Sequence, residues 1–83
     1  MATTSDEQRV AAFGAAVRLR REELGLSQEK LGEKAKVHRT YVSDVERGAR
    51  NPTVKVIWKL ADALETTPSR LFDSAERVTN RRR

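Results

Sequence analysis

LGLSQEKLGEKAKVHRTYVSDVERGARNP, residues 24–52, is the stretch that decides the fold of this chain. It predicts two short helices, because apolar residues recur at helical spacing on both sides of a very short connection. Ser27 is a good N-cap for a helix from Gln28 to about Ala35. A second helix runs from about Arg39 to Arg47, with Gly48 at the position that ends it. We therefore expect two helices of about two turns each, one directly after the other.

The flanking sequence has the same helical spacing. Apolar residues predict a long helix over residues 6–24, which Gly25 ends. Thr53 caps a fourth helix that runs to about Leu64, and Pro68 opens a fifth helix of one turn through Leu71 and Phe72. No stretch alternates apolar and polar residues as a strand does. The sequence predicts the all-α class, a compact five-helix bundle around a helix-turn-helix pair.

The predicted domain covers residues 9–73, because the connections between these helices are short and the ends of the chain are poor in apolar groups. Residues 1–8 are expected to be a flexible N-terminus, and residues 74–83 a basic C-terminal tail that ends in Arg81, Arg82 and Arg83.

Composition excludes several classes of protein. The 83 residues include 17 Lys and Arg, 12 Asp and Glu and no cysteine, for a net charge of +5. A chain of this length buries only about 60% of its unfolded surface and has little room for a deep substrate cavity. Disulfides and cysteine metal sites are excluded, and no apolar run approaches the ~18 residues of a membrane span. We expect a cytoplasmic protein without a cofactor, metal, small-molecule ligand or membrane contact.

The excess positive charge is local. Residues 1–27 and 54–80 each carry four basic and four acidic side chains, whereas residues 28–53 carry six basic and four acidic ones. A local surplus favours a polyanion bound at the central segment. A solvated face followed by a disordered tail is equally compatible with the charge alone.

Residues 24–72 resemble the DNA-binding domain of the phage-repressor and Cro-like (XRE-type) regulators, a five-helix family. Five elements in order carry the resemblance, which extends back to Phe13 and Gly14: LSQ at a cap, an apolar pair three residues apart, ERG, NP and LAxAL. Within the family, HRTYVSDVERGARNP and a short final helix are most similar to the controller proteins of restriction-modification systems. The resemblance implies a sequence-specific DNA-binding transcription regulator.

The resemblance also implies a partly buried ion pair between Arg21 and Glu46 that fastens the domain and contacts no base. Three departures accompany it. Lys36 stands where the turn between the two helices usually has Gly, and Gly32 stands where the family has Ala. Near the end of the first helix the family more commonly has a polar residue followed by an apolar one. Here the order is reversed, with Leu19 before Arg20, which predicts an exposed Leu19.

Base recognition is expected from the side of the second short helix opposite the apolar residues Val42 and Val45, because a recognition helix enters the major groove with its N-terminal residues nearest the bases. Arg39 is the best single candidate, since its guanidinium can donate two hydrogen bonds to guanine. Asp44 has two interpretations, accepting a hydrogen bond from cytosine N4 and holding Arg39 or Arg47 in place, and we favour the second. The predicted base-contacting set is His38, Arg39, Thr40, Ser43 and Asp44.

Phosphate contacts are expected beside this set. Gln28 begins a helix, whose positive end favours an anion, and it matches the family's Gln at that position. Tyr41 has two interpretations, core packing and a phosphate contact through its hydroxyl. The predicted phosphate-contacting set is Gln28, Tyr41, Arg47, Arg50 and Asn51.

The single histidine, His38, supports no chemistry of its own. It is either a DNA contact or a poor helix cap. No cysteine or second histidine is present to complete a metal site, and no oxyanion motif accompanies His38 with Ser27 or Ser43. We expect no enzymatic activity.

A homodimer on a palindromic operator is expected, because one short recognition helix reads too few base pairs to select a site in a genome. Trp58, Leu71 and Phe72 supply more apolar surface than so small a core absorbs, and they are the predicted dimer interface. Trp58 covering the core is an equally good interpretation. Two alternative functions are an autoregulating antitoxin with a toxin partner, and a protein-interaction adaptor built on the same domain.

Overall fold

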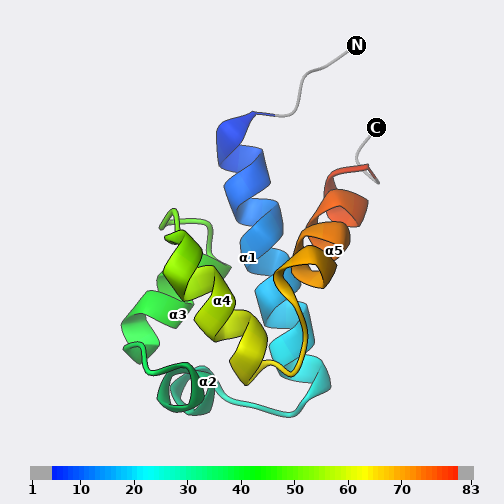
Figure 1. The fold of residues 1–83 in the computed structure, drawn as a ribbon. Coiled ribbons are helices and arrows are strands. Elements are labelled where there is room, and N and C mark those ends of the chain that lie inside the picture. The colour runs from blue at the N-terminus through cyan, green and yellow to red at the C-terminus, as the bar shows by residue number, and fades with distance from the viewer. Residues whose placement is uncertain (1–4, 81–83) are drawn as a thin grey trace.

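The structure is a computed structural model that describes residues 5–80. This part of the chain contains five α-helices and no strand, which confirms the predicted all-α class (Figure 1). No helix within it has the length and apolar content needed to cross a bilayer. The helices are α1 (Asp6–Glu23), α2 (Gln28–Ala35), α3 (Arg39–Glu46), α4 (Val54–Ala63) and α5 (Pro68–Asn80).

All five helices contribute to one core. α3 and α5 both pack against α1, α2 packs against α3 and α4, and α5 runs antiparallel to α1 (Figure 1). Small side chains on α1 allow this close packing. The largest side chains with no exposed surface or almost none are Val17, Leu31, Val42, Val45, Leu60 and Leu64.

The α2–α3 turn has the backbone conformation that the family's usual glycine would favour. Lys36 ends α2 in the left-handed region, at φ 60° and ψ 43°. The Val37 amide then donates to the Gly32 carbonyl oxygen at 2.9 Å. A Cβ on Gly32 would come within 2.7 Å of the Val37 carbonyl oxygen. The two departures at positions 32 and 36 are thus neighbours in space, and Gly32 makes room for the turn that Lys36 forms.

The α3–α4 connection is fixed on α1. The Gly48 amide donates to the Val45 carbonyl at 3.0 Å, and the Ala49 amide donates to the Asp44 carbonyl at 2.8 Å. This pair of bonds is a Schellman motif, with Gly48 at φ 75°. A Cβ on Gly48 would come within 2.9 Å of the Ala11 Cα. The backbone after α3 therefore starts from a well-defined position.

The prediction of a one-turn fifth helix is wrong, because α5 has 13 residues and continues to Asn80. Ala75 is buried and Val78 packs against the core. Packing against α1 therefore stabilises the last helical turns of α5, although their own sequence has few apolar groups. Residues 74–80, expected in a tail, are helical. Residues 6–8, expected in a flexible segment, open α1 with a capping box between Ser5 and Gln8. Residues 1–4 and Arg81, Arg82 and Arg83 lie outside the described residues.

Candidate nucleic-acid interface

α3 has one buried side and one open side. Val42 and Val45 are 0% and 1% exposed, so they hold α3 against the core. His38, Arg39 and Thr40 are exposed at the beginning of the helix, and Ser43 and Asp44 are half-buried one turn later. The five residues predicted to face the bases therefore extend along one short helix, from its N-cap to its last turn.

Arg39 is unpaired within the described part of the chain, where its guanidinium has neither a hydrogen bond nor an ion pair. The arginines that follow α3 are different, because Arg47 and Arg50 both pair with Asp44. An unpaired guanidinium at the start of a recognition helix keeps all its donors for a ligand.

His38 is the N-cap of α3. Its Nδ1 accepts a hydrogen bond from the Thr40 amide at 3.0 Å, which gives an otherwise unbonded amide of the first turn a partner. This bond requires the imidazole to lack a proton on Nδ1. The capping interpretation of His38 is confirmed, and its ring remains exposed. A base contact by His38 stays a prediction.

Asp44 takes the second of the two roles considered for it. Its Oδ1 lies 2.5 Å from Arg47 Nη2, and its Oδ2 lies 3.6 Å from Arg50 Nη2. The Asp44 side chain is 20% exposed. The pairing with Arg47 follows from their spacing of three residues, whereas the pairing with Arg50 depends on the path of the loop. Asp44 therefore holds two residues that are predicted phosphate contacts, and a base contact by Asp44 stays a prediction.

Tyr41 packs against the core and also contacts a cation. Its ring is partly buried, as the core interpretation predicted. The Arg50 guanidinium carbon lies 4.7 Å from the centre of the ring. Arg50 thus has partners on two sides, Asp44 and Tyr41. A phosphate contact by the Tyr41 hydroxyl stays a prediction, as does one by the exposed side chain of Asn51.

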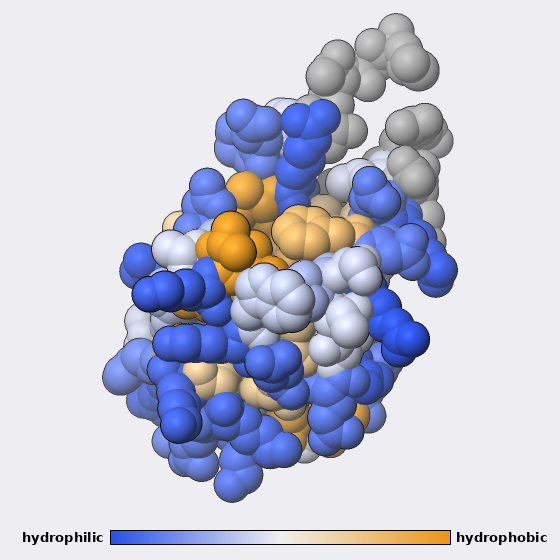
Figure 2. Space-filling model, viewed as in Figure 1, coloured by the Kyte–Doolittle hydropathy of each residue, from blue (hydrophilic) through white to orange (hydrophobic). Residues whose placement is uncertain are grey.

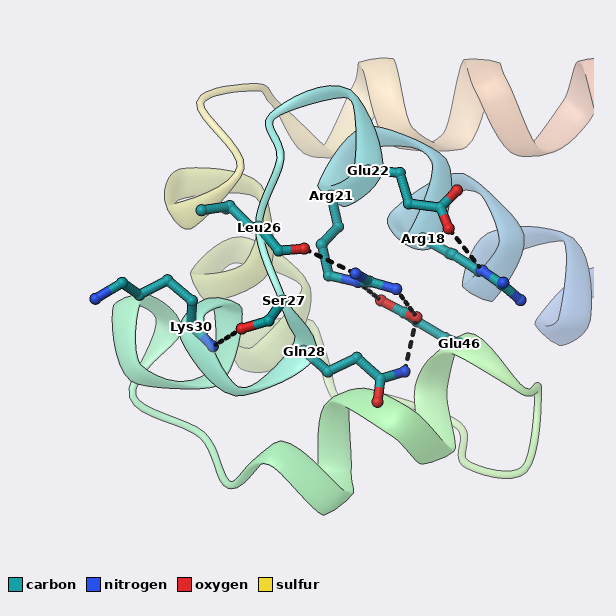
Figure 3. Close-up of polar contacts among 8 residues, drawn as sticks. All are labelled: Arg18, Arg21, Glu22, Leu26, Ser27, Gln28, Lys30 and Glu46. Atoms are coloured by element: carbon teal, nitrogen blue, oxygen red, sulfur yellow. Dashed lines mark hydrogen bonds and ion pairs between the residues drawn. The ribbon is translucent and has the colours of Figure 1, made fainter.

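The predicted ion pair between Arg21 and Glu46 is present and joins α1 to α3 (Figure 3). Arg21 Nε and Nη2 donate to the two Glu46 carboxylate oxygens at 2.6 and 3.0 Å, and Arg21 Nη1 donates to the Leu26 carbonyl at 2.8 Å. The Glu46 side chain is only 2% exposed. Hydrogen bonding to Glu46 raises the pKa of Arg21 above its usual value, so the pair stays ionised on the Arg side.

Gln28 joins this pair, a contact that sequence reasoning missed. Its Nε2 donates to the Glu46 carboxylate at 3.0 Å, which fixes the side chain at the beginning of α2 (Figure 3). An amide nitrogen has two hydrogens, so one of them remains for another acceptor. A phosphate contact by Gln28 is therefore compatible with its position and stays a prediction.

The predicted dimer surface needs one correction. Leu71 is 3% exposed and belongs to the core, because it lies on the side of α5 that faces α1. Trp58 and Phe72 are 57% and 46% exposed, and the Phe72 ring packs 4.9 Å from that of Phe13. Val54, one turn before Trp58, is also exposed. Figure 2 shows apolar side chains gathered on this face, over α4 and its neighbours, with hydrophilic ones around them.

Leu19 is the remaining large apolar side chain with high exposure within residues 5–80, as its reversed order with Arg20 predicted. Arg20 is used differently. Its Nε donates to the Leu64 carbonyl at 2.9 Å and its Nη2 to the Glu65 carbonyl at 3.2 Å, at the end of α4. The reversal therefore places a cation where it binds the C-terminal carbonyls of another helix.

The family model for helix-turn-helix domains, HTH_3, matches residues 17–71, which include the end of α1, all of α2, α3 and α4, and the beginning of α5. The chain belongs to this helix-turn-helix family. It is a DNA-binding transcription regulator of the helix-turn-helix class, as the resemblance of residues 24–72 implied.

This helix-turn-helix regulator is similar to proteins described as restriction-modification controllers. It is 45% identical over 62 residues to control protein C.BamHI of Bacillus amyloliquefaciens, which covers 74% of this chain and 76% of the relative. It is 47% identical over 47 residues to control protein C.SmaI of Serratia marcescens, 57% of this chain and 56% of the relative. The crystal structure of the controller protein C.AhdI from Aeromonas hydrophila has a TM-score of 0.74 and 44% identity, and covers 75% of this chain and 94% of that one.

Proposed function

We propose that this chain binds a palindromic operator as a homodimer and regulates transcription in the manner of a restriction-modification controller protein. The observation that carries the proposal is that Arg39 has no partner among residues 5–80, at the exposed beginning of a helix whose other side is fixed by Val42 and Val45. The similarity to C.BamHI and C.AhdI supports the controller role.

The base contacts in this proposal are Arg39, Thr40, Ser43 and the His38 ring. Arg39 donates two hydrogen bonds to O6 and N7 of one guanine, which contributes about 1 to 3 kcal/mol of discrimination per half-site. Thr40 offers a methyl group to thymine and a hydroxyl to a base or phosphate. Ser43, one turn after Arg39, reaches a neighbouring base or phosphate.

The phosphate contacts are Gln28 at the beginning of α2, the Tyr41 hydroxyl on α3, and Arg47, Arg50 and Asn51 directly after α3. These groups bind the DNA backbone without regard to sequence and set the position of α3 in the groove. They also make the affinity fall with salt, because each neutralised phosphate releases counterions.

The dimer follows from a limit on discrimination, since one helix of eight residues contacts only a few base pairs. The exposed apolar side chains Val54, Trp58 and Phe72 form the proposed interface between two copies. An interface of this kind has an apolar, aromatic-rich centre and polar groups at its edge, and the face in Figure 2 has apolar side chains with hydrophilic ones around them.

The test is to select bound duplexes from a random DNA pool and to footprint the protein on the enriched sequence. We expect two inverted half-sites whose protected guanines are about 34 Å, one helical turn, apart. We also expect a log–log salt slope of about −3 to −6 from the phosphate contacts of two protomers. Enrichment of a single, asymmetric site would overturn the dimer, and no enrichment at all would overturn the operator-binding function.

A further inference from the structure

We propose that Asp44 is a positioning residue that raises the specificity of DNA binding by holding Arg47 and Arg50 in place before DNA arrives. This inference rests on the proposed operator-binding function. Asp44, Arg47, Arg50 and Tyr41 are called the Asp44 cluster below. In this proposal the Asp44 carboxylate contacts the two arginines, and other residues of α3 contact the bases.

The geometry of the carboxylate favours this role. Asp44 has two oxygens, and each faces one arginine: Oδ1 the Nη2 of Arg47, Oδ2 the Nη2 of Arg50. The Asp44 side chain is only 20% exposed, whereas those of Arg47 and Arg50 are 63% and 49% exposed. The carboxylate therefore forms the base of the cluster, and the two guanidinium groups extend to solvent with donors left for phosphates.

The backbone below the cluster is fixed as well. The Ala49 amide donates to the carbonyl oxygen of Asp44 itself, so the turn after α3 closes on the residue whose side chain holds the arginines. Gly48, in the middle of this turn, lies against Ala11 of α1. Arg50 then folds back over the Tyr41 ring, at 4.7 Å. The main chain just before Arg50 and the Arg50 side chain are thereby restrained.

Such restraint changes specificity because it reduces the conformational entropy that the two arginine side chains lose on binding. A free arginine side chain has large rotamer freedom, which it loses when it binds a phosphate at one defined position. At the operator the two arginines are already ordered, so less of the binding free energy is lost. Unrelated DNA is bound in many registers, and for it ordered arginines are no advantage.

The charge of Asp44 acts in the same direction. The carboxylate reduces the charge of the two arginines from +2 to +1 and repels nearby phosphates. Non-specific binding depends almost entirely on charge, so Asp44 weakens it directly. Specific binding depends also on geometry and recovers part of this loss from the ordered arginines. Asp44 thus lowers affinity for unrelated DNA more than affinity for the operator.

The test compares Asp44→Asn with wild type, using the full chain, the selected operator and an unrelated duplex of the same length over a range of salt. The variant keeps the shape of the side chain and removes its charge. We expect affinity for the unrelated duplex to rise about threefold to tenfold, with a salt slope steeper by up to about 2 per dimer. We expect affinity for the operator to rise by less than affinity for the unrelated duplex, so that the ratio of operator affinity to unrelated affinity decreases.

Asp62→Asn is the matched control, because Asp62 is an exposed carboxylate of α4 outside the Asp44 cluster and the substitution changes the net charge equally. It is expected to leave the affinity ratio at the wild-type value. Asp44→Glu restores the charge on a longer side chain and is expected to recover most of the ratio. If Asp44→Asn and Asp62→Asn change both affinities alike, Asp44 acts only through net charge and the positioning role is wrong.

A second measurement needs no DNA. The arginine Nε–H signals of Arg47 and Arg50 in nuclear magnetic resonance spectra are expected to be dispersed and protected in wild type and to collapse toward the free-arginine position in Asp44→Asn. Unchanged signals would overturn the positioning role whatever the DNA-binding measurements of the variant show. A wild-type protein that prefers no duplex sequence would instead overturn the proposed function, so the two failures are distinct.

Discussion

Gly14 of α1 lies directly against the backbone of α3, so close that a Cβ on Gly14 would come within 2.0 Å of the Val45 carbonyl oxygen. The same Cβ would lie 2.9 Å from the Glu46 carbonyl oxygen. α1 and α3 therefore meet backbone to backbone, at the end of α3 that also carries the buried carboxylate of Glu46. The close approach of α3 to α1 therefore depends on the absence of a side chain at Gly14.

We expect Gly14→Ala to destabilise the domain by about 2 to 3 kcal/mol, because α1 and α3 must separate to admit the methyl group. Helix propensity alone predicts the opposite, a gain of about 1 kcal/mol for Ala over Gly in a helix. Urea unfolding followed by circular dichroism measures the difference. An equal or higher unfolding free energy in Gly14→Ala would show that the helices move apart without cost.

Lys36→Gly is expected to stabilise the domain by about 1 kcal/mol, because Lys36 has φ 60° and a side chain in this region is strained. Lys34→Gly is the matched control. It removes the same charge from the last turn of α2, where glycine costs about 1 kcal/mol. Thermal unfolding should therefore move in opposite directions for the two variants, and a shift in the same direction would refute the strain at position 36.

Arg21→Ala is expected to cost about 3 to 5 kcal/mol, because the Glu46 carboxylate then stays buried without its cation. Arg18→Ala breaks an exposed pair with Glu22 on the same helix and should cost less than about 1 kcal/mol. The double variant Arg21→Ala, Glu46→Ala should be more stable than Arg21→Ala, since the unpaired charge is gone. A double variant less stable than both single variants would contradict this account.

Arg39→Ala is expected to lose about 1 to 3 kcal/mol of binding per half-site on the selected operator and much less on unrelated DNA. The fold should be intact, because the Arg39 side chain is exposed. Arg77→Ala removes the same charge from α5 and should weaken binding to the operator and to unrelated DNA slightly and equally. If Arg39→Ala also weakened both equally, Arg39 would be a phosphate contact and the base contacts would have to be reassigned.

Trp58→Ser is expected to weaken dimerisation at least about tenfold, since a central aromatic side chain often contributes 2 kcal/mol or more to an interface. Leu19→Ser removes another exposed apolar side chain, on α1, and should leave the dimer intact. Sedimentation equilibrium measures both. A dimer lost in Leu19→Ser and kept in Trp58→Ser would place the interface at α1.

The helix-turn-helix pair could be predicted from the sequence because its boundaries are local. Ser27, Thr53 and Gly48 act through hydrogen bonds or backbone angles within a few residues of themselves, and the structure has them at the expected positions. Residues 73–80 of α5 could not be predicted in this way. They depend on α1, a helix far away in the sequence, against which Ala75 and Val78 pack.

The candidate site divides in the same manner. Asp44 and Arg47 are three residues apart, so their contact was among the expected ones. The Arg50–Tyr41 contact depends on how the chain turns at Gly48, and the Gln28–Glu46 bond depends on how α2 meets α3. Leu71 was assigned to the dimer interface because so small a core was expected to absorb little apolar surface, and the longer α5 gives Leu71 a place in that core.

The exposed position of Trp58 also makes the intrinsic fluorescence of this protein sensitive to contacts at α4. Trp58 is the only tryptophan in the sequence and Tyr41 the only tyrosine. Their intrinsic fluorescence therefore separates two faces of the molecule: emission from tryptophan arises at α4, and emission from tyrosine arises at α3, beside Arg50. Association between copies and binding of a ligand at α3 can be followed in the same cuvette, without attaching any dye.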